Sequence, residues 1–435
     1  MGKGGLIVSA AAVISTLVFF GSLALIFAER LHRSITAIAG AVVMVVLGRL
    51  MGFYSETQAL RAVDFNTLGL LFGMMLLVAM LEPTGFFQYV AVLSARASRG
   101  KPRRLFILLG GITTLLSMFL DNVTTVVLIA PVTILITEVL GLSPLPYLVA
   151  EALLSNTGGV ATLVGDPPNV LIGSAAGLTF NDFLTHSLPI VAVAWVGALL
   201  LLRYLFRREL AKRPRGTRAV MKLDPAESLD QPANARKILI VLGAAILLFF
   251  FHGALHISAA LVALGAAATA LVWVQPEITD VLKRIEWSVL IFFGSLFVMV
   301  GGLEAAGVLD GVASAVGGLA GIPPVVFGIG LIWVVAALSA VVDNIPITIA
   351  LIPVLQSLGA SGMEVGPLWW ALAFGAGFGG NGTLIGSTTN IIVATFSEKT
   401  RTPITSAAWV RLGLPVMLIT CAIASVLYAM IYPWL

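Results

Sequence analysis

The feature that most constrains this chain is a phrase that it contains twice. Gly-Gly-x-x-Thr-Leu-x-Gly-x-x-x-Asn occupies residues 158–169 and again residues 379–390, at a separation of 221 positions. Each copy interrupts an otherwise apolar stretch. Glycine, proline and polar side chains break a hydrophobic run only where the freed backbone groups have another use, and inside a membrane that use is usually a substrate or ion site. The repeated phrase therefore predicts two broken helices within a membrane.

Apolar segments of about membrane-spanning length recur along the chain. Of its 435 residues, 59% are hydrophobic and 11% are charged. A helix that crosses ~30 Å of hydrocarbon needs about 20 mostly apolar residues. The first run lacks a small-residue cleavage pattern and is followed by further spans, so it is interpreted as a retained helix rather than a signal peptide. The predicted spans are 6–28, 35–53, 65–81, 187–206, 238–251, 257–274, 287–303 and 409–432.

The repetition extends well beyond the phrase. Asp121-Asn122 and Asp343-Asn344 lie 222 residues apart, and in each pair a proline follows the aspartate by ten positions. Further matches occur upstream at nearly the same separation, and such an ordered series indicates internal duplication. The predicted units are a first inverted repeat at 1–206, a charged linker at 207–235 and a second inverted repeat at 236–435.

Each repeat is predicted to contain five transmembrane helices, one of them broken, and one re-entrant hairpin. The hairpins are expected at 104–140 and 322–358, and the broken spans at 147–175 and 368–396. A hairpin that enters and leaves on the same side adds no crossing. Each repeat then crosses five times, and the second copy is inverted relative to the first. The predicted fold class is an all-α polytopic membrane protein.

The distribution of Lys and Arg favours five crossings per repeat over six. Residues 304–365 contain neither Lys nor Arg, whereas five loops are basic. Five crossings place all the basic loops on one side, and positive charge marks the cytoplasmic side. The linker 207–235 is therefore predicted to be cytoplasmic and the C-terminus outside, in a multi-pass protein of the inner membrane. The net charge of +4 reflects these loops and does not indicate a nucleic-acid partner. The basic loops are 29–33, 96–104, 203–237, 275–284 and 397–411.

Three aspartates within apolar sequence are the strongest functional candidates. Asp121, Asp166 and Asp343 are predicted to bind and release protons, because an ionisable side chain at membrane depth is costly and marks a functional site by default. The alternative is that they only cap half-helices, since aspartate is a good N-cap. That alternative is strongest for Asp166, because Ser387 stands at its place in the second copy.

The polar residues around these aspartates are predicted to complete the site. Half-helices that end inside the membrane direct their dipole ends and free backbone groups at a central cavity. Amide and hydroxyl side chains would add hydrogen bonds or ligands. The predicted substrate- and ion-binding residues are Asp121, Asn122, Thr124, Thr162, Asp166, Asn169, Asp343, Asn344, Asn381, Thr383, Ser387 and Asn390.

Enzymatic and cofactor-dependent functions find no support in the sequence. There is no Walker-type phosphate loop, and no serine–histidine–acid or zinc-protease spacing. The single cysteine, Cys421, excludes an internal disulfide and a thiolate metal cluster, and the four histidines show no metal-binding spacing. We therefore expect no enzyme activity, no cofactor and no metal centre.

The resemblance to known proteins rests on Asp121-Asn122-Val123-Thr124-Thr125, Gly165-Asp166-Pro167-Pro168-Asn169, Asp343-Asn344 and Gly380-Asn381-Gly382-Thr383-Leu384-Ile385-Gly386. Through these motifs nearly the whole chain resembles the ion transporter superfamily. More narrowly it looks like the branch that holds arsenite efflux permeases of the ArsB type, NhaD-type sodium/proton antiporters and the melanosomal P protein. The resemblance implies an inverted repeat with two hairpins and two broken helices, and a homodimer with a scaffold and a moving transport domain.

The substrate is predicted from the chemistry of the motifs. Related dicarboxylate carriers have Ser-Asn-Thr at the hairpin tips, and aspartate there would repel a carboxylate. The first prediction is export of arsenite and antimonite in exchange for protons, because arsenite at neutral pH is a small uncharged trihydroxide and no Lys or Arg lies in either motif region. The alternative is sodium/proton antiport, and a citrate-type organic-anion carrier ranks third. The expected partners are this small substrate, protons and membrane lipid, with a cytoplasmic ATPase subunit as a further candidate.

Overall fold

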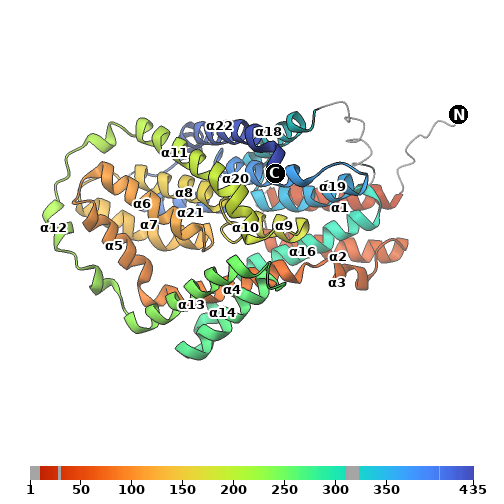
Figure 1. The fold of residues 1–435 in the computed structure, drawn as a ribbon, viewed down its shortest axis with the longest axis horizontal. Helices are drawn as coiled ribbons and strands as arrows, with labels where there is room; N and C mark the ends of the chain where they lie inside the picture. Colours follow the sequence, from red (N-terminus) through yellow and green to blue (C-terminus); the bar gives the residue numbers. More distant parts are fainter. Residues whose placement is uncertain (1–9, 28–30, 310, 312–322, 401) are drawn as a thin grey trace.

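The computed structural model describes residues 10–27, 31–309, 311, 323–400 and 402–435. Every regular element among these residues is helical (Figure 1), and eight helices are long and apolar enough to cross a membrane. The predicted all-α polytopic fold class is confirmed. Some predicted residues lie outside the described ranges: 6–9 and 28 of the first span, 29, 30 and 401 of the basic loops, and 322 of the second hairpin.

Six helices form a flanking group in which the two halves of the chain pack crosswise. Helix α2 packs against α1 and α16, and α14 packs against α13 and α4. Because α1, α2 and α4 precede the linker and the other three follow it, the same contacts recur with the halves exchanged. A duplicated unit would produce this pattern. The helices are α1 (Ala10–Phe27), α2 (Arg33–Met51), α4 (Phe65–Leu81), α13 (Pro232–Phe251), α14 (Ala259–Val274) and α16 (Trp287–Ala305).

Two helical hairpins begin a second set of helices, termed the hairpin group. Each hairpin turns within a few residues at one of the Asp-Asn pairs, and the aspartate stands at the N-cap of the second helix. Proline opens α6 and α18, where its missing N–H leaves no hydrogen bond unmade. The hairpin helices are α6 (Pro102–Ser117) and α7 (Asn122–Val139), then α18 (Pro324–Val341) and α19 (Asn344–Ala360).

Each predicted broken span consists of two helices separated by the repeated phrase. Helix α6 packs on α8 and α18 on α20, whereas α7 packs on α21 and α19 on α9. Each hairpin therefore contacts the broken helices of both halves. The four helices are α8 (Leu145–Gly159) and α9 (Pro167–Ala176), then α20 (Gly366–Gly379) and α21 (Thr388–Glu398).

The last span of each half completes the hairpin group. Helices α11 (Leu188–Leu205) and α22 (Ser406–Ile431) pack against each other; α8 contacts both, and α20 contacts α22. A π-helical turn at Phe183–Ser187 leads into α11. These long apolar helices leave large side chains exposed, among them Leu200 and Val426, as contact with lipid requires.

The amphipathic helix α5 (Phe86–Ala97) was not predicted from the sequence. It packs on α6 and α7 and against a 3-10 turn of the linker at Pro225–Ser228. Gly85 precedes α5 with φ 79°, and a Cβ there would overlap the carbonyl oxygen of Ser228, so this position requires glycine. The remaining short helices are α3 (Glu56–Ala62), α10 (Phe180–Asp182), α12 (Thr217–Lys222) and α15 (Ile278–Lys283).

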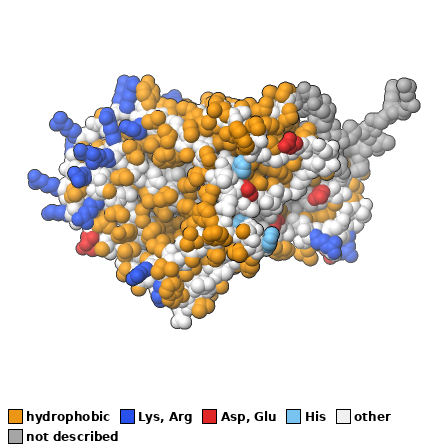
Figure 2. Space-filling view, viewed as in Figure 1, with side chains coloured by type: hydrophobic (Ala, Val, Ile, Leu, Met, Phe, Trp, Pro, Cys, Tyr) orange, Lys and Arg blue, Asp and Glu red, His pale blue; other side chains and the backbone are white. Residues whose placement is uncertain are grey.

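Positive charge is concentrated at one end of the molecule. Figure 2 shows most Lys and Arg side chains of the visible face at the end where Figure 1 places α5, α6 and α12, with hydrophobic surface beyond them. The termini of the described chain lie away from that end (Figure 1). Helices α7 and α18 are themselves long enough to span a membrane, so the re-entrant character of the hairpins stays a prediction.

Candidate functional site

The asparagine that ends the repeated phrase holds the first break together. Asn169 Nδ2 donates to the carbonyl oxygens of Gly159, at 3.1 Å, and Thr162, at 2.8 Å. These two carbonyls follow the end of α8, where the helix no longer supplies partners. The Thr162 hydroxyl donates in turn to the Met118 carbonyl in the hairpin turn. The phrase thus ties the end of α8, the start of α9 and the hairpin tip into one unit.

The second break repeats these contacts residue for residue. Asn390 Nδ2 donates to the carbonyl oxygens of Gly380, at 2.8 Å, and Thr383, at 2.9 Å. The Thr383 hydroxyl donates to the Ala340 carbonyl beside the second hairpin turn. The recurrence of the phrase is therefore explained by a shared backbone scaffold, whatever the substrate is.

Glycine is needed inside both breaks because two backbone segments meet there. A Cβ on Gly165 would lie 2.6 Å from Gly159 O and 2.9 Å from Ser117 O. A Cβ on Gly386 would lie 2.8 Å from Gly380 O. Each of these oxygens belongs to the backbone and cannot move aside as a side chain would.

Replacing Gly165 or Gly386 with alanine is expected to destabilise the fold by about 1–3 kcal/mol each, because overpacking at a rigid site forces backbone shifts. Thermal unfolding of the detergent-purified variants would measure the loss. Gly243→Ala, in the interior of α13 with no atom within 4 Å of the added Cβ, is the matched control and should not destabilise. Equal melting temperatures for all three variants would contradict the close approach.

Four helix N-termini meet at a single cavity of about 70 Å³ between the flanking group and the hairpin group. Asp121, Asp166, Asp343 and Ser387 stand at the N-caps of α7, α9, α19 and α21, and all four line the cavity. The partial positive charge at a helix N-terminus stabilises nearby anionic groups. This convergence explains how three carboxylates can share one small cavity.

The three aspartates differ in how their charge is balanced. Asp121 accepts hydrogen bonds from Thr124 N, at 2.9 Å, and Thr124 Oγ1, at 3.0 Å, so it caps its own helix. Asp166 makes no capping bond and accepts one from Asn344 Nδ2, at 3.2 Å, although only 3% of its surface is exposed. Among the described residues, Asp343 alone of the three forms an ion pair.

The partner of Asp343 is Arg33, the first residue of α2. Arg33 Nη1 lies 3.2 Å from Asp343 Oδ2 and 2.9 Å from Thr388 Oγ1, and the Thr388 hydroxyl also reaches the same carboxylate oxygen at 3.2 Å. The guanidinium carbon lies 5.6 Å from the centre of the Phe292 ring, within range of a cation–π contact. This contact joins the flanking group to the hairpin group.

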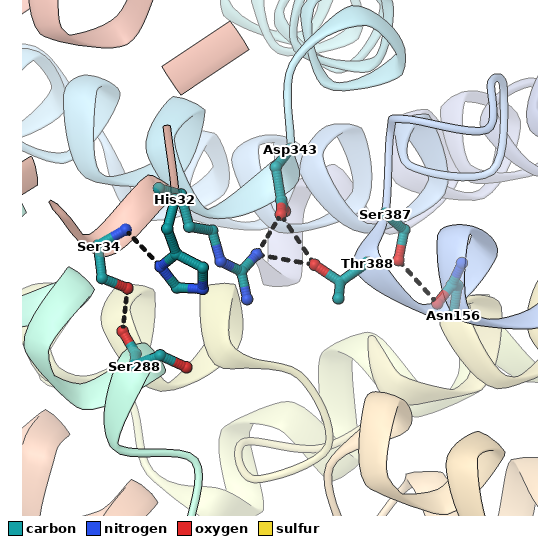
Figure 3. Close-up of polar contacts among 8 residues, drawn as sticks. His32, Ser34, Asn156, Ser288, Asp343, Ser387 and Thr388 are labelled. Carbon is teal, nitrogen blue, oxygen red and sulfur yellow. Dashed lines mark hydrogen bonds and ion pairs between the residues drawn. The ribbon is translucent and has the colours of Figure 1, made fainter. Parts of the chain in front are cut away.

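The start of α2 is itself anchored to α16. Ser34 N donates to His32 Nδ1 at 3.3 Å, and Ser34 Oγ donates to Ser288 O at 2.7 Å (Figure 3). The sequence places Arg33 in a basic loop and finds no Lys or Arg in either motif region. The folded site differs from that expectation, because the crosswise packing of α2 brings this arginine into the cavity.

Glu286, at the N-cap of α16, is a further cavity residue that the sequence did not single out. Burial, and then the negative charge of Asp121, raise the pKa of the Glu286 carboxyl from 4.5 to about 7, against the opposing effect of Arg33. Glu82 also lines the cavity and pairs with Arg284 at 2.8 Å.

The raised pKa of Glu286 predicts a pH dependence of stability. In the folded protein Glu286 keeps its proton from about pH 4.5 to about pH 7, where the unfolded chain has lost it. Stability from this group is therefore present below about pH 4.5 and declines as the pH rises to about 7. Glu286→Gln should flatten the decline in melting temperature across this window, whereas the exposed Glu227→Gln should not. Parallel curves for Glu286→Gln and the unsubstituted protein would contradict the assignment.

Asn156 connects the two breaks at the centre of the hairpin group. Its Nδ2 donates to Asn381 Oδ1, at 3.1 Å, and to Asn390 Oδ1, at 2.9 Å. Its Oδ1 accepts from Asn122 Nδ2, at 3.2 Å, and from Ser387 Oγ, at 3.3 Å (Figure 3). Every member of this network is buried. Asn156 is not among the predicted site residues.

The Asn156 network is not repeated in the second half of the hairpin group. Gly377 stands 221 residues after Asn156, and Val160 stands 221 residues before Asn381. A Cβ on Gly377 would overlap the Val160 side chain, so the corresponding contact is small and apolar. The two halves therefore share a backbone scaffold and differ in the polar groups that they carry.

The structure divides the predicted site residues into two sets. One set lines the cavity: Asp121, Asn122, Thr124, Asp166, Asp343, Asn344 and Ser387. The other set lies behind the cavity wall, bonded within and around the breaks: Thr162, Asn169, Asn381, Thr383 and Asn390. The cavity residues that sequence reasoning missed are Arg33, Glu82, Arg284, Glu286 and Thr388.

The cavity combines protonatable groups with two arginines. Its lining contains five acidic side chains and two arginines. Within the part of the chain that the structure describes, no three His, Cys, Asp or Glu side chains are arranged to hold a metal ion. Such a site can exchange protons and can attract small cations, and it offers little to a multiply charged anion.

Comparison with known proteins shows that the relatives of this chain are membrane transporters. The family model CitMHS, described as a citrate transporter, matches residues 23–375. A 46 kDa membrane protein of Mycobacterium leprae is 38% identical over 434 residues, covering 98% of each chain. An uncharacterized transporter of Mycobacterium tuberculosis is 37% identical over 434 residues, also covering 98% of each. The human P protein is 32% identical over 491 residues, which cover 94% of this chain and 59% of that protein.

A solved structure has a similar fold. The YdaH transporter of Alcanivorax borkumensis, whose crystal structure is described as having an unusual topology, superposes with a TM-score of 0.53. It covers 98% of this chain and 99% of its own at 18% identity, so the likeness concerns the fold alone. The predicted likeness to the P protein is confirmed, while the narrower likeness to arsenite permeases and NhaD-type antiporters stays a prediction.

Proposed function

This chain belongs to the CitMHS citrate transporter family, and we propose that it exchanges protons for a small inorganic solute, of which a monovalent cation fits the cavity best. The observation that supports this proposal is that the three aspartates of the cavity differ in whether a positive charge neutralises them. Arg33 balances Asp343, whereas Asp166 is buried with one hydrogen bond from Asn344 and shares its cavity with Asp121. A buried carboxylate without a cation is costly, so proton or cation binding at this pair would relieve it.

A free tricarboxylate is a poorer fit. The five acids that line the cavity exceed its two arginines by three charges, and both arginines already pair with acids. Binding citrate would require Arg33 to leave Asp343 and would place three more negative charges beside Asp121 and Asp166. The family description therefore supports transport in general more than it supports free citrate as this chain's substrate.

Export of arsenite or antimonite against protons is the second candidate. The hydroxyls of Thr124 and Thr388 and the amide of Asn344 line the cavity next to protonatable carboxyls, a set that an uncharged trihydroxide could contact. Against it, the amides of Asn156, Asn169 and Asn390 are already bonded to protein groups. The neutral groups left for such a solute are few.

Transport by purified protein in vesicles tests these alternatives directly. The vesicles have an acidic interior that contains a pH-sensitive dye. One solute at a time is added outside: sodium, potassium, arsenite, citrate, or citrate together with magnesium. Protons should leave when a monovalent cation is added, and vesicles without protein should show no response. Proton movement with citrate alone would overturn the proposal, and movement with arsenite alone would select the second candidate.

The inverted-repeat arrangement is proposed together with this function. The crosswise pairs α2–α16 and α4–α14, and the matched contacts of the two breaks, support a duplicated unit. The linker 207–235 would then be cytoplasmic and the C-terminus outside, in the inner membrane. Homodimer formation and an associated ATPase subunit stay predictions from the family resemblance.

Cysteine labelling tests the sidedness. Cys421 is buried and gives a low background, so single cysteines at Glu227→Cys and Trp434→Cys would report the linker and the C-terminus. An impermeant maleimide added to intact cells should label Trp434→Cys and should reach Glu227→Cys only after lysis. Labelling of both on the same side would refute the five-crossing topology.

A further inference from the structure

A stripe of buried polar side chains runs along the interface of α7 and α8, away from the cavity. The two helices pack against each other, and the stripe consists of seven polar residues that are each at least 97% buried. The stripe starts at the cavity with Asn122 and leads toward the end of α7 that adjoins the basic surface. Its members are Asn122, Thr125, Thr133 and Thr137 on α7, and Glu151, Ser155 and Asn156 on α8.

Two hydrogen bonds cross this interface and frame the stripe. Asn122 Nδ2 donates to Asn156 Oδ1 at 3.2 Å beside the cavity. Thr133 Oγ1 donates to Glu151 Oε1 at 2.5 Å further along. Five residues separate Glu151 from Asn156, which corresponds to about 7.5 Å along α8. The Glu151 carboxyl is therefore close to the site without lining it.

Three polar atoms of the stripe have no hydrogen-bond partner among the described residues. They are Thr125 Oγ1, Glu151 Oε2 and Ser155 Oγ, and all three residues are fully buried. Native interiors rarely leave such groups unpaired, so several at one interface indicate a place where water or a proton is held. The second Glu151 oxygen is the ionisable atom among them.

No charged group near Glu151 provides a permanent partner. The helices packed on α8 carry few titratable residues, and none of these makes an ion pair or hydrogen bond with Glu151 in the described structure. A carboxylate in this position would be unbalanced, and binding a proton would remove its charge. The other titratable residues on α8 and on these helices are Arg103 and Arg104 on α6, Glu138 on α7, Tyr147 on α8, Arg203 and Tyr204 on α11, Glu398 on α21, and Arg411, Cys421 and Tyr428 on α22.

The fold does not require this polarity. At the corresponding positions of the second half, Leu372 stands for Glu151 and Ala376 for Ser155, and the hairpin carries Ile347 for Thr125 and Leu355 for Thr133. The interface of α19 and α20 is thus built on the same scaffold with apolar residues. A purely structural need would apply to both halves, so the acid in the first half points to a separate role.

We propose that Glu151 is a proton-binding residue outside the cavity, which exchanges protons with the Asp121–Asp166 site along the α7–α8 stripe. The proposal rests on the proposed proton coupling and adds to it the group that loads the proton. Asn122 and Asn156 stand between Glu151 and the aspartates and cannot ionise, so a proton would pass this point through water held by the unpaired hydroxyls. Glu151 accepts a proton at Oε2 and releases the same proton toward the site, which needs no other reactant.

Two transport modes measured on one protein separate this role from a structural one. In proton-driven uptake, a pH difference drives solute accumulation. In counterflow, labelled solute exchanges for unlabelled solute at equal pH on both sides. The solute is the one that the unsubstituted protein moves in the vesicle assay. Glu151→Gln should lower proton-driven uptake by about tenfold or more and leave counterflow within about twofold.

Two further variants keep the test decisive. Glu151→Leu copies the residue at the corresponding position of the second half, and it should show the same selective loss. Thr133→Val keeps the Glu151 carboxyl and removes its one hydrogen-bond donor. This variant should shift the pH profile of uptake without abolishing uptake. It decides the question if the two Glu151 variants fail to fold. Wild-type proton-driven uptake and pH profiles in the folded variants would overturn the proposal. Absence of proton coupling in the unsubstituted protein would instead refute the proposed function.

Discussion

Replacing Asp166 with asparagine is expected to abolish proton-coupled transport, with a loss of about 100-fold or more. Asparagine matches aspartate in shape and can still accept from Asn344, but it can neither bind nor release a proton. Asp121→Asn should have a comparable effect, and because asparagine is also a good N-cap, α7 should keep its start. Proton release from vesicles on addition of solute measures both variants.

The controls separate loss of coupling from loss of folding. Asp230→Asn removes an exposed carboxylate from the linker and should transport normally. Asn169→Ala removes the two bonds that hold the first break, so it should lower the yield and melting temperature of the protein as well as transport. A stable Asp166→Asn variant that still couples protons would contradict the assignment of Asp166.

Much of the fold was predictable because span length and chain breaks are local properties. The eight predicted spans and both hairpins agree with helices of the structure within a few residues. Hydrophobic length sets a membrane helix, and glycine, proline and Asp-Asn pairs mark where it must stop. Helix α5 was missed because it is amphipathic and shorter than a span.

The site was predictable only where its residues lie in the repeated motifs. The three aspartates were found because charge is rare in apolar sequence. Asn169 and Asn390 were predicted as binding residues; in the structure both hold carbonyls of their own breaks, and neither lines the cavity. A motif that recurs in both halves marks a structural requirement that the halves share. Here that requirement is largely the set of hydrogen bonds that holds the backbone at each helix break.

Residues whose partners lie in the other half of the chain are not marked by a repeated motif. Arg33 looks like one of many loop charges, and Glu286 like the end of a span. Their roles follow from the packing of α2 on α16 and of α16 on α19, and the Arg33–Asp343 contact links residues 310 positions apart. Asn156 is another such residue, because its partners Asn381 and Asn390 lie in the second half of the chain.

Removing the charge of Arg33 is expected to reduce transport by about tenfold to a hundredfold, because it leaves Asp343 without its cation. Arg33→Gln can still donate a hydrogen bond to Thr388 but cannot neutralise the carboxylate. The pair joins the flanking group to the hairpin group, so its loss should also weaken the arrangement in which the two groups enclose the cavity. Arg33→Lys should recover part of the activity, since it restores charge without the planar donor pair.

A matched control and a double variant make the role of Arg33 decisive. Arg49 lies on the same helix and pairs with Glu56 in solvent, where an ion pair contributes little, so Arg49→Gln should behave as the unsubstituted protein. Combining Arg33→Gln with Asp343→Asn removes both charges, and the loss in melting temperature should then be smaller than for Arg33→Gln alone. If the two losses simply add, Arg33 and Asp343 are not coupled. A second outcome is that the double variant loses less melting temperature than Arg33→Gln alone and still couples protons. The ion pair then serves to join the two helix groups, and Asp121 and Asp166 carry the protons.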